Sequence, residues 1–104
     1  MRIGPLEVDQ AQFEAICTKW GVVRVQAFGS VLRPDFSASS DVDLLVDFEP
    51  GSTLTLFDLD VVAKEFEALL GRSVDLVTRR GVMSSENTIR RRAILESAVT
   101  LYAA

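Results

Sequence analysis

The segment 42–48, VDLLVDF, constrains the fold most, because apolar and acidic side chains alternate along it. Successive side chains of a β-strand point to opposite faces of a sheet. One face of this predicted strand carries Val42, Leu44, Val46 and Phe48. The other face carries Asp41, Asp43, Leu45 and Asp47. A strand with one apolar face needs a covering layer, so we expect helices packed on a sheet.

The covering layer is predicted most clearly over residues 55–70. Thr55 followed three residues later by Asp58 suits the start of a helix, and Gly71 suits its end. The apolar residues of this segment recur at helical spacing: Leu59, Val62, Ala63, Phe66, Leu69 and Leu70. A second helix is predicted over 9–20, capped by Asp9 and ended by Gly21. Its buried stripe is Phe13, Ile16, Cys17 and Trp20.

The remaining elements complete an alternating order of helices and strands. Strands are predicted at 22–28 and 73–78, a helix at 85–97 and a short edge strand at 98–102. Residues 30–40 are expected to form a helical turn followed by a loop, and residues 79–83 a loop. The predicted fold class is therefore α/β, and 104 residues suffice for a single domain over 1–104.

Charge and composition exclude several classes of function. The net charge of −4 disfavours broad nucleic-acid binding, which needs clustered Lys and Arg. The chain has no histidine, so a histidine base or zinc ligand is excluded. A single cysteine, Cys17, allows no internal disulfide, and no apolar run approaches the roughly 20 residues of a membrane helix. We therefore expect a cytoplasmic protein.

The acidic pair Asp41 and Asp43 is the first candidate for chemistry. Two residues apart on a strand, these side chains share a face at a separation of about 6–7 Å. Like charges so placed repel, which favours a bound cation between them, and Mg²⁺ accepts carboxylate oxygens while bridging to phosphates. Asp75 lies on the next predicted strand. If the two strands are neighbours, it can serve as a third ligand or as a base.

The pair Gly29-Ser30 directly follows the first predicted strand. Glycine lets a backbone approach a phosphate closely, and serine can cap the following turn or donate to a phosphate oxygen; we expect both roles for Ser30. Phosphate donors beside metal ligands are typical of phosphoryl or nucleotidyl transfer, in which positioning and charge neutralisation dominate catalysis.

The sequence GS, ten residues, then DVD, with a later aspartate on a strand, resembles the polymerase-β-like nucleotidyltransferase superfamily. Within it, the chain is similar to minimal nucleotidyltransferase (MNT) domains over nearly its whole length. The resemblance implies a small mixed sheet with helices packed on it. It also implies two Mg²⁺ ions on Asp41, Asp43 and Asp75, and a triphosphate of ATP held by Gly29, Ser30 and Arg33. Pro34 departs from the glycine that often follows this arginine.

The resemblance also implies a partner. MNT proteins commonly accompany a HEPN-domain ribonuclease as its antitoxin, and some transfer AMP from ATP to a tyrosine of that toxin. The predicted function is therefore protein nucleotidylation acting as an antitoxin, with Asp75 as the group that activates the accepting hydroxyl. The alternative is a non-catalytic antitoxin that neutralises its partner by binding. A weaker alternative is nucleotidylation of a small molecule.

Other charged residues have simpler interpretations. Asp47 is expected to be solvated or paired with a Lys or Arg. Arg90, Arg91 and Arg92 spread around a helix, so all three cannot reach one site, although one of them can. Arg79 and Arg80 follow the strand of Asp75 and are expected near the same cleft. Nothing in the sequence assigns a role to Tyr102.

Overall fold

The computed structural model describes all residues from Met1 to Ala104. Its centre is a four-stranded sheet in the order β5-β4-β3-β6. The strands are β3 (Val22–Phe28), β4 (Val42–Phe48), β5 (Val74–Thr78) and β6 (Val99–Ala103). β4 runs parallel to β5, whereas β3 runs antiparallel to both β4 and β6, so the sheet is mixed. The mixed sheet with packed helices confirms the predicted fold class.

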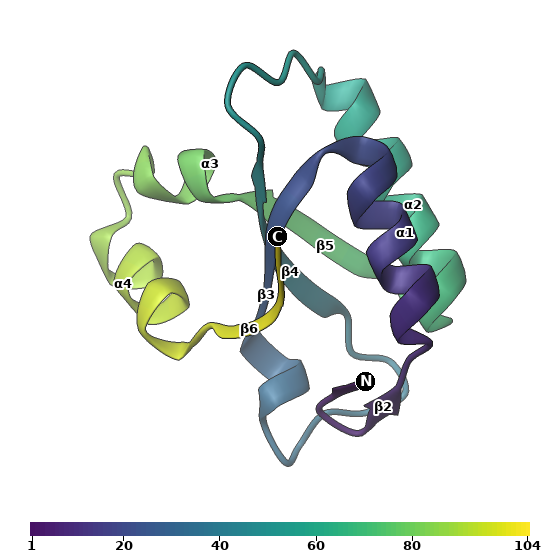
Figure 1. Cartoon of the computed structure of the whole chain (residues 1–104). Coiled ribbons are helices and arrows are strands. Elements are labelled where there is room, and N and C mark those ends of the chain that lie inside the picture. The colour runs from purple at the N-terminus through teal and green to yellow at the C-terminus, as the bar shows by residue number, and fades with distance from the viewer.

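Helices lie on both sides of this sheet (Figure 1). Helices α1 (Gln10–Trp20) and α2 (Leu56–Leu70) lie side by side on one side. The short helix α3 (Arg79–Met83) and helix α4 (Thr88–Ser97) lie on the other. A small antiparallel hairpin, β1 (Arg2–Ile3) and β2 (Leu6–Glu7), precedes α1. None of these helices has the length and apolarity needed to cross a membrane.

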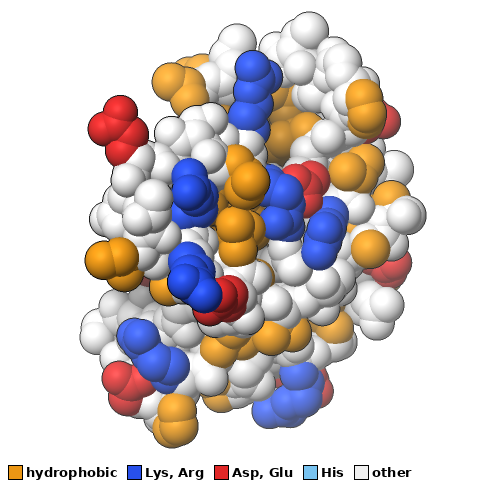
Figure 2. Space-filling model, turned by 90° about the vertical axis from the view of Figure 1, so that its left-hand side faces the viewer, with side chains coloured by type: hydrophobic (Ala, Val, Ile, Leu, Met, Phe, Trp, Pro, Cys, Tyr) orange, Lys and Arg blue, Asp and Glu red, His pale blue; other side chains and the backbone are white.

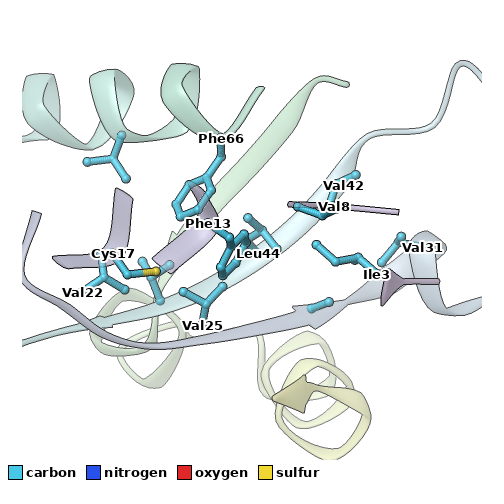
Figure 3. Close-up of a cluster of buried hydrophobic side chains, with 13 residues drawn as sticks. Ile3, Val8, Phe13, Cys17, Val22, Val25, Val31, Val42, Leu44 and Phe66 are labelled. Carbon is cyan, nitrogen blue, oxygen red and sulfur yellow. The ribbon is translucent and has the colours of Figure 1, made fainter. Parts of the chain in front are cut away.

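The main core fills the space between the sheet and helices α1 and α2 (Figure 3). Phe13 of α1 and Phe66 of α2 are fully buried, with ring centroids 5.1 Å apart. They pack with Leu44 and Val25 of the sheet. Cys17 is also in this core, and burial, with a smaller contribution from Glu14, raises the pKa of its thiol to about 12. The thiol therefore stays protonated, as expected of a core cysteine.

Both long helices begin and end where the sequence predicts. Asp9 accepts a hydrogen bond from the Gln12 N–H at 3.0 Å at the start of α1. Thr55 and Asp58 form a reciprocal capping box at the start of α2. Each helix ends at a glycine with a left-handed backbone, Gly21 and Gly71. Local side-chain chemistry thus fixes these boundaries, in agreement with the sequence.

Four local features differ from what the sequence predicts or were not predicted. Residues 79–83 form helix α3 instead of a loop, because the Thr78 hydroxyl accepts from the Gly81 N–H at 3.0 Å and caps it. Helix α4 begins at Thr88 instead of residue 85, where Asn87 is its cap. The β1–β2 hairpin was not predicted. In β3, simple alternation would bury Val23 together with Val25. A register irregularity between Val22 and Arg24 buries Val22 instead.

Candidate functional site

The three predicted acidic residues meet at one end of the sheet. Asp41 immediately precedes β4, and Asp43 is the second residue of that strand. Asp43 is level with Asp75 on β5, its parallel neighbour, and with Phe28 at the end of β3. Phe28 packs with Leu45 and the helical residue Ile94, which places Asp43 on the sheet face that carries α3 and α4. The register and the charge interactions place Asp41 and Asp75 near Asp43, whereas the role of the three carboxylates in binding a metal stays a prediction.

The electrostatics of this end of the sheet centre on Asp43. Partial burial is the main cause that raises the pKa of its carboxyl, and the charges of Asp75 and then Asp41 raise it further. Arg90 and Arg33 lower this pKa by smaller amounts. The ionised form of Asp43 is thus disfavoured by its surroundings, and a cation beside the three carboxylates would relieve the repulsion.

The Gly29-Ser30 pair lies against Asp43 and the backbone of Asp41. Gly29 starts the 3₁₀ turn η1 (Gly29–Leu32) with φ of 76°, and a Cβ atom there would collide with the carboxylate of Asp43. The Ser30 hydroxyl donates to the backbone carbonyl of Asp41 at 3.3 Å. Ser30 therefore does not cap the turn as predicted: it lies inside η1, whose N-cap is Phe28. Its contact with a phosphate stays a prediction.

The loop between η1 and Asp41 is held by a residue that sequence reasoning missed. Arg72, just before β5, donates to the carbonyls of Ser37 and Ser40 at 2.6 and 3.3 Å. Its guanidinium also lies over the ring of Phe36, 4.6 Å from the centroid. Arg72 thereby fixes the segment that leads into Asp41. No local pattern marks it, because its partners lie more than 30 residues away in the sequence.

The arginines near the three carboxylates differ in their ion pairs and hydrogen bonds. Arg33 forms an exposed ion pair with Asp35 at 3.4 Å, while its charge acts on Asp43. Arg90 makes no ion pair, and its charge also acts on Asp43. Arg91 donates to the carbonyls of Met83 and Ser85, and Arg92 pairs with Glu96 at 2.8 Å. Only one residue of the triple thus acts on the site, as expected.

Asp47 shares the sheet face of Asp43 but has its own partner. It accepts from Arg79 Nε at 3.0 Å, and Arg79 also donates to Gln26. These contacts satisfy polar groups that the fold partly buries. Of the two alternatives expected for Asp47, solvation or pairing with a basic residue, the structure shows the pair, and its partner is Arg79.

The donor set fits a hard divalent cation but does not enclose one. All three candidate ligands are carboxylates, which Mg²⁺ prefers. No group of three or more Asp, Glu, His or Cys side chains is arranged to hold a metal ion by itself. Mg²⁺ usually takes only one or two carboxylates and completes its shell with water and substrate phosphates. The residues therefore fit an ion that binds together with a nucleotide.

The site is open to solvent. Asp41 and Asp75 are exposed, and Asp43 is half-buried. Three cavities of about 350 to 410 Å³ are lined by other residues. A cavity of about 350 Å³ lies at the other end of β4, near Phe48 and Glu49, away from the aspartates.

Comparisons with known proteins agree with this geometry. The family model described as a nucleotidyltransferase domain matches residues 10–100. The protein adenylyltransferase MntA of Thermococcus cleftensis is 42% identical over 67 residues, which span 64% of this chain and 65% of that protein. MJ0435 of Methanocaldococcus jannaschii is 39% identical over 67 residues, which span 64% of this chain and 70% of that protein. It is provisionally named a protein adenylyltransferase.

Solved structures show the same fold. A structure provisionally described as a minimal nucleotidyltransferase has a TM-score of 0.65 and 40% identity, covering 88% of this chain and 91% of that one. A toxin–antitoxin structure with AMP-PNP has a TM-score of 0.70 and 19% identity, covering 93% and 75%. At 19% identity this second likeness concerns the fold alone.

Proposed function

Because the chain belongs to the nucleotidyltransferase domain family, we propose that it transfers AMP from Mg-ATP to a hydroxyl group of a partner protein. The observation that carries this proposal is the meeting of Asp41, Asp43 and Asp75 on one open sheet end, where the ionised form of Asp43 is disfavoured. Such a site is poised for a cation and a polyphosphate. Relatives named protein adenylyltransferases support the choice of AMP as the transferred group.

The proposed site residues divide into two sets. Asp41, Asp43 and Asp75 would hold two Mg²⁺ ions, which when bound neutralise the phosphate charge and polarise the reacting phosphoryl group. The missing side chain of Gly29 leaves room for the Asp43 carboxylate, Ser30 follows Gly29 in the turn η1, and Arg33 directly follows that turn. These residues would hold the triphosphate of ATP.

The reaction needs one proton transfer and one in-line displacement. The acceptor oxygen forms a bond to the α-phosphorus, and the bond from that phosphorus to the oxygen bridging to the β-phosphate breaks, so that pyrophosphate leaves. Asp75 accepts the proton of the hydroxyl, since its carboxylate faces the same site as Asp43. Arg90 and Arg33 oppose the negative charge that accumulates there.

The proposed acceptor is a tyrosine of a HEPN-domain toxin, with this chain as the antitoxin in the cytoplasm. The openness of the site favours a protein acceptor over a small molecule, which would need a walled pocket. Fold neighbours that are toxin–antitoxin complexes support this kind of partner.

ATP is expected to bind at least about tenfold more tightly with Mg²⁺ than without it, because three carboxylates facing a triphosphate repel it until a cation intervenes. Calorimetric titration of ATP in MgCl₂ and in EDTA at matched ionic strength measures this. Asp60→Asn is the control, since it removes one charge from an exposed ion pair on α2 and should leave both affinities unchanged. Equal ATP affinity in the two buffers would contradict the metal-dependent site.

A further inference from the structure

A second groove, of about 350 Å³, lies along the outer edge of the sheet, between β5, the start of α2, and helices α3 and α4. Its floor and walls are mainly apolar and include Leu56, Leu76 and Val82. Leu56 is 85% exposed, so most of its apolar side chain is in contact with solvent. The proposed catalytic residues do not line this groove, so its apolar surface is unexplained by them.

The edge of β5 gives the groove free backbone hydrogen-bonding groups. β5 is an edge strand of the sheet, and the carbonyl of Ser73, directly before it, accepts from the Val42 N–H of β4. By alternation, the backbone N–H and C=O groups of Asp75 and Val77 also point toward β4, whereas those of Leu76 point away from it. The outward N–H of Val74 is satisfied by Glu67 at 2.8 Å, but no hydrogen bond outside the sheet involves the Leu76 backbone. An exposed strand edge of this kind can pair with an added strand.

The charge of the groove is positive although the chain is negative overall. Arg90 and Arg91 line it, and no acidic residue does. Arg91 is fixed at the groove by its bonds to the carbonyls of Met83 and Ser85, and Arg90 has no acidic partner in an ion pair. Figure 2 looks onto this side of the molecule, where blue side chains stand around orange ones. Apolar side chains together with a carboxylate would complement such a surface.

The groove is adjacent to the proposed active site. Val77 lines it and lies two residues beyond Asp75 on the same strand, so both side chains face the same side. Arg90 borders the groove and also acts on Asp43. A polypeptide lying in the groove would therefore pass beside the carboxylates that the transfer reaction requires.

We propose that this groove binds an extended, apolar and acidic segment of the acceptor protein, which adds as a strand to the edge of β5 and carries the accepting hydroxyl to Asp43 and Asp75. Backbone pairing at Leu76 would fix the direction of the segment, and Arg90 and Arg91 would select its carboxylates. The inference rests on the proposed function for the identity of the occupant, but its binding step needs neither ATP nor metal.

The test uses two short synthetic peptides, each with one tyrosine among alternating apolar residues. One peptide carries two glutamates, and the other carries lysines in their place. NMR titration of the isotopically labelled whole chain, without ATP, measures binding and amide exchange. The glutamate peptide should slow exchange of the Leu76 amide, while the Asp75 amide, already bonded to β4, should not change. The lysine peptide should bind at least about tenfold more weakly.

Two adjacent exposed residues of α2 supply matched variants. Leu56→Asp places a carboxylate on the groove and should weaken the glutamate peptide at least about tenfold. Phe57→Asp makes the same kind of change at a residue that is 76% exposed and outside the groove, and should leave binding unchanged. Unchanged Leu76 exchange, or equal affinities across the variants and peptides, would overturn the groove assignment. If the chain binds the glutamate peptide but transfers no AMP to any acceptor, the proposed function would be overturned instead.

Discussion

Replacing Asp43 with asparagine is expected to reduce AMP transfer by about a hundredfold or more while the chain stays folded. The substitution keeps the size of the side chain and removes one ligand charge. Asp43 lies between Asp75 and the Gly29 turn, so no other carboxylate can occupy its place. The loss should therefore appear in the rate of transfer and not in the amount of folded protein.

The same substitution should stabilise the metal-free chain at neutral pH. Surroundings that raise the pKa of Asp43 favour its protonated form in the folded state, so its contribution to stability is greatest at low pH. That contribution declines as pH rises from the ordinary aspartate value through the raised folded-state pKa. Asparagine does not ionise, so the advantage of the variant should be largest at pH 7 and should shrink below about pH 4.

Urea unfolding in EDTA at several pH values, with a transfer assay in Mg²⁺, measures both effects. Asp60→Asn is the control and should change neither quantity, because Asp60 is exposed on α2. An Asp43→Asn chain that unfolds at neutral pH would show that Asp43 is a structural residue. A variant that transfers AMP at the normal rate would exclude Asp43 from the chemistry.

Gly29→Ala is expected to lose most of the transfer activity, also by about a hundredfold. The φ of 76° at Gly29 is left-handed, and this strains an alanine by about 1–2 kcal/mol. The added methyl group would also meet the carboxylate of Asp43, so that the carboxylate must move. A displacement of about 1 Å at a reacting group can cost a hundredfold in rate.

Gly51→Ala separates these two effects. Gly51 has a φ of 83°, but a Cβ atom there would meet nothing within 4 Å. Both variants should lose stability in urea, Gly29→Ala by more because of the contact with Asp43, whereas only Gly29→Ala should lose transfer activity. Equal transfer rates in the two variants would mean that the closeness of Gly29 to Asp43 has no role in the reaction.

Much of the sheet and of its acidic end follows from local sequence pattern. Alternation in VDLLVDF sets which side chains face α2 and which share the face of Asp43. Capping residues set both ends of α1 and α2, because their hydrogen bonds join residues three or four apart. The alignment of Asp43 with Asp75 needed only the assumption that β4 and β5 are neighbours, which the structure confirms.

What the sequence did not predict depends on contacts between distant segments. Arg72 binds carbonyls of the loop before Asp41, and backbone carbonyls leave no sequence signature. The burial of Val22 follows from a register irregularity that β3 adopts against its neighbour β4. Helix α3 is only five residues long, too short for a periodic pattern, and its cap at Thr78 lies within a predicted strand. The groove beside β5 is likewise visible only once α2 and α4 are placed.

Following the α-phosphate of ATP distinguishes AMP transfer from neutralisation by binding. The chain is incubated with Mg²⁺, a co-purified HEPN-domain partner, and ATP labelled at either the α- or the γ-phosphate. We expect label on a tyrosine of the partner from α-labelled ATP alone, and none when Asp41 and Asp43 are both asparagine. The modified partner should also stay inactive after this chain is removed, because the attached phosphate is a fixed negative charge. Absence of label, with neutralisation retained by the double variant and reversed on dissociation, would contradict the account and identify an antitoxin that acts by binding.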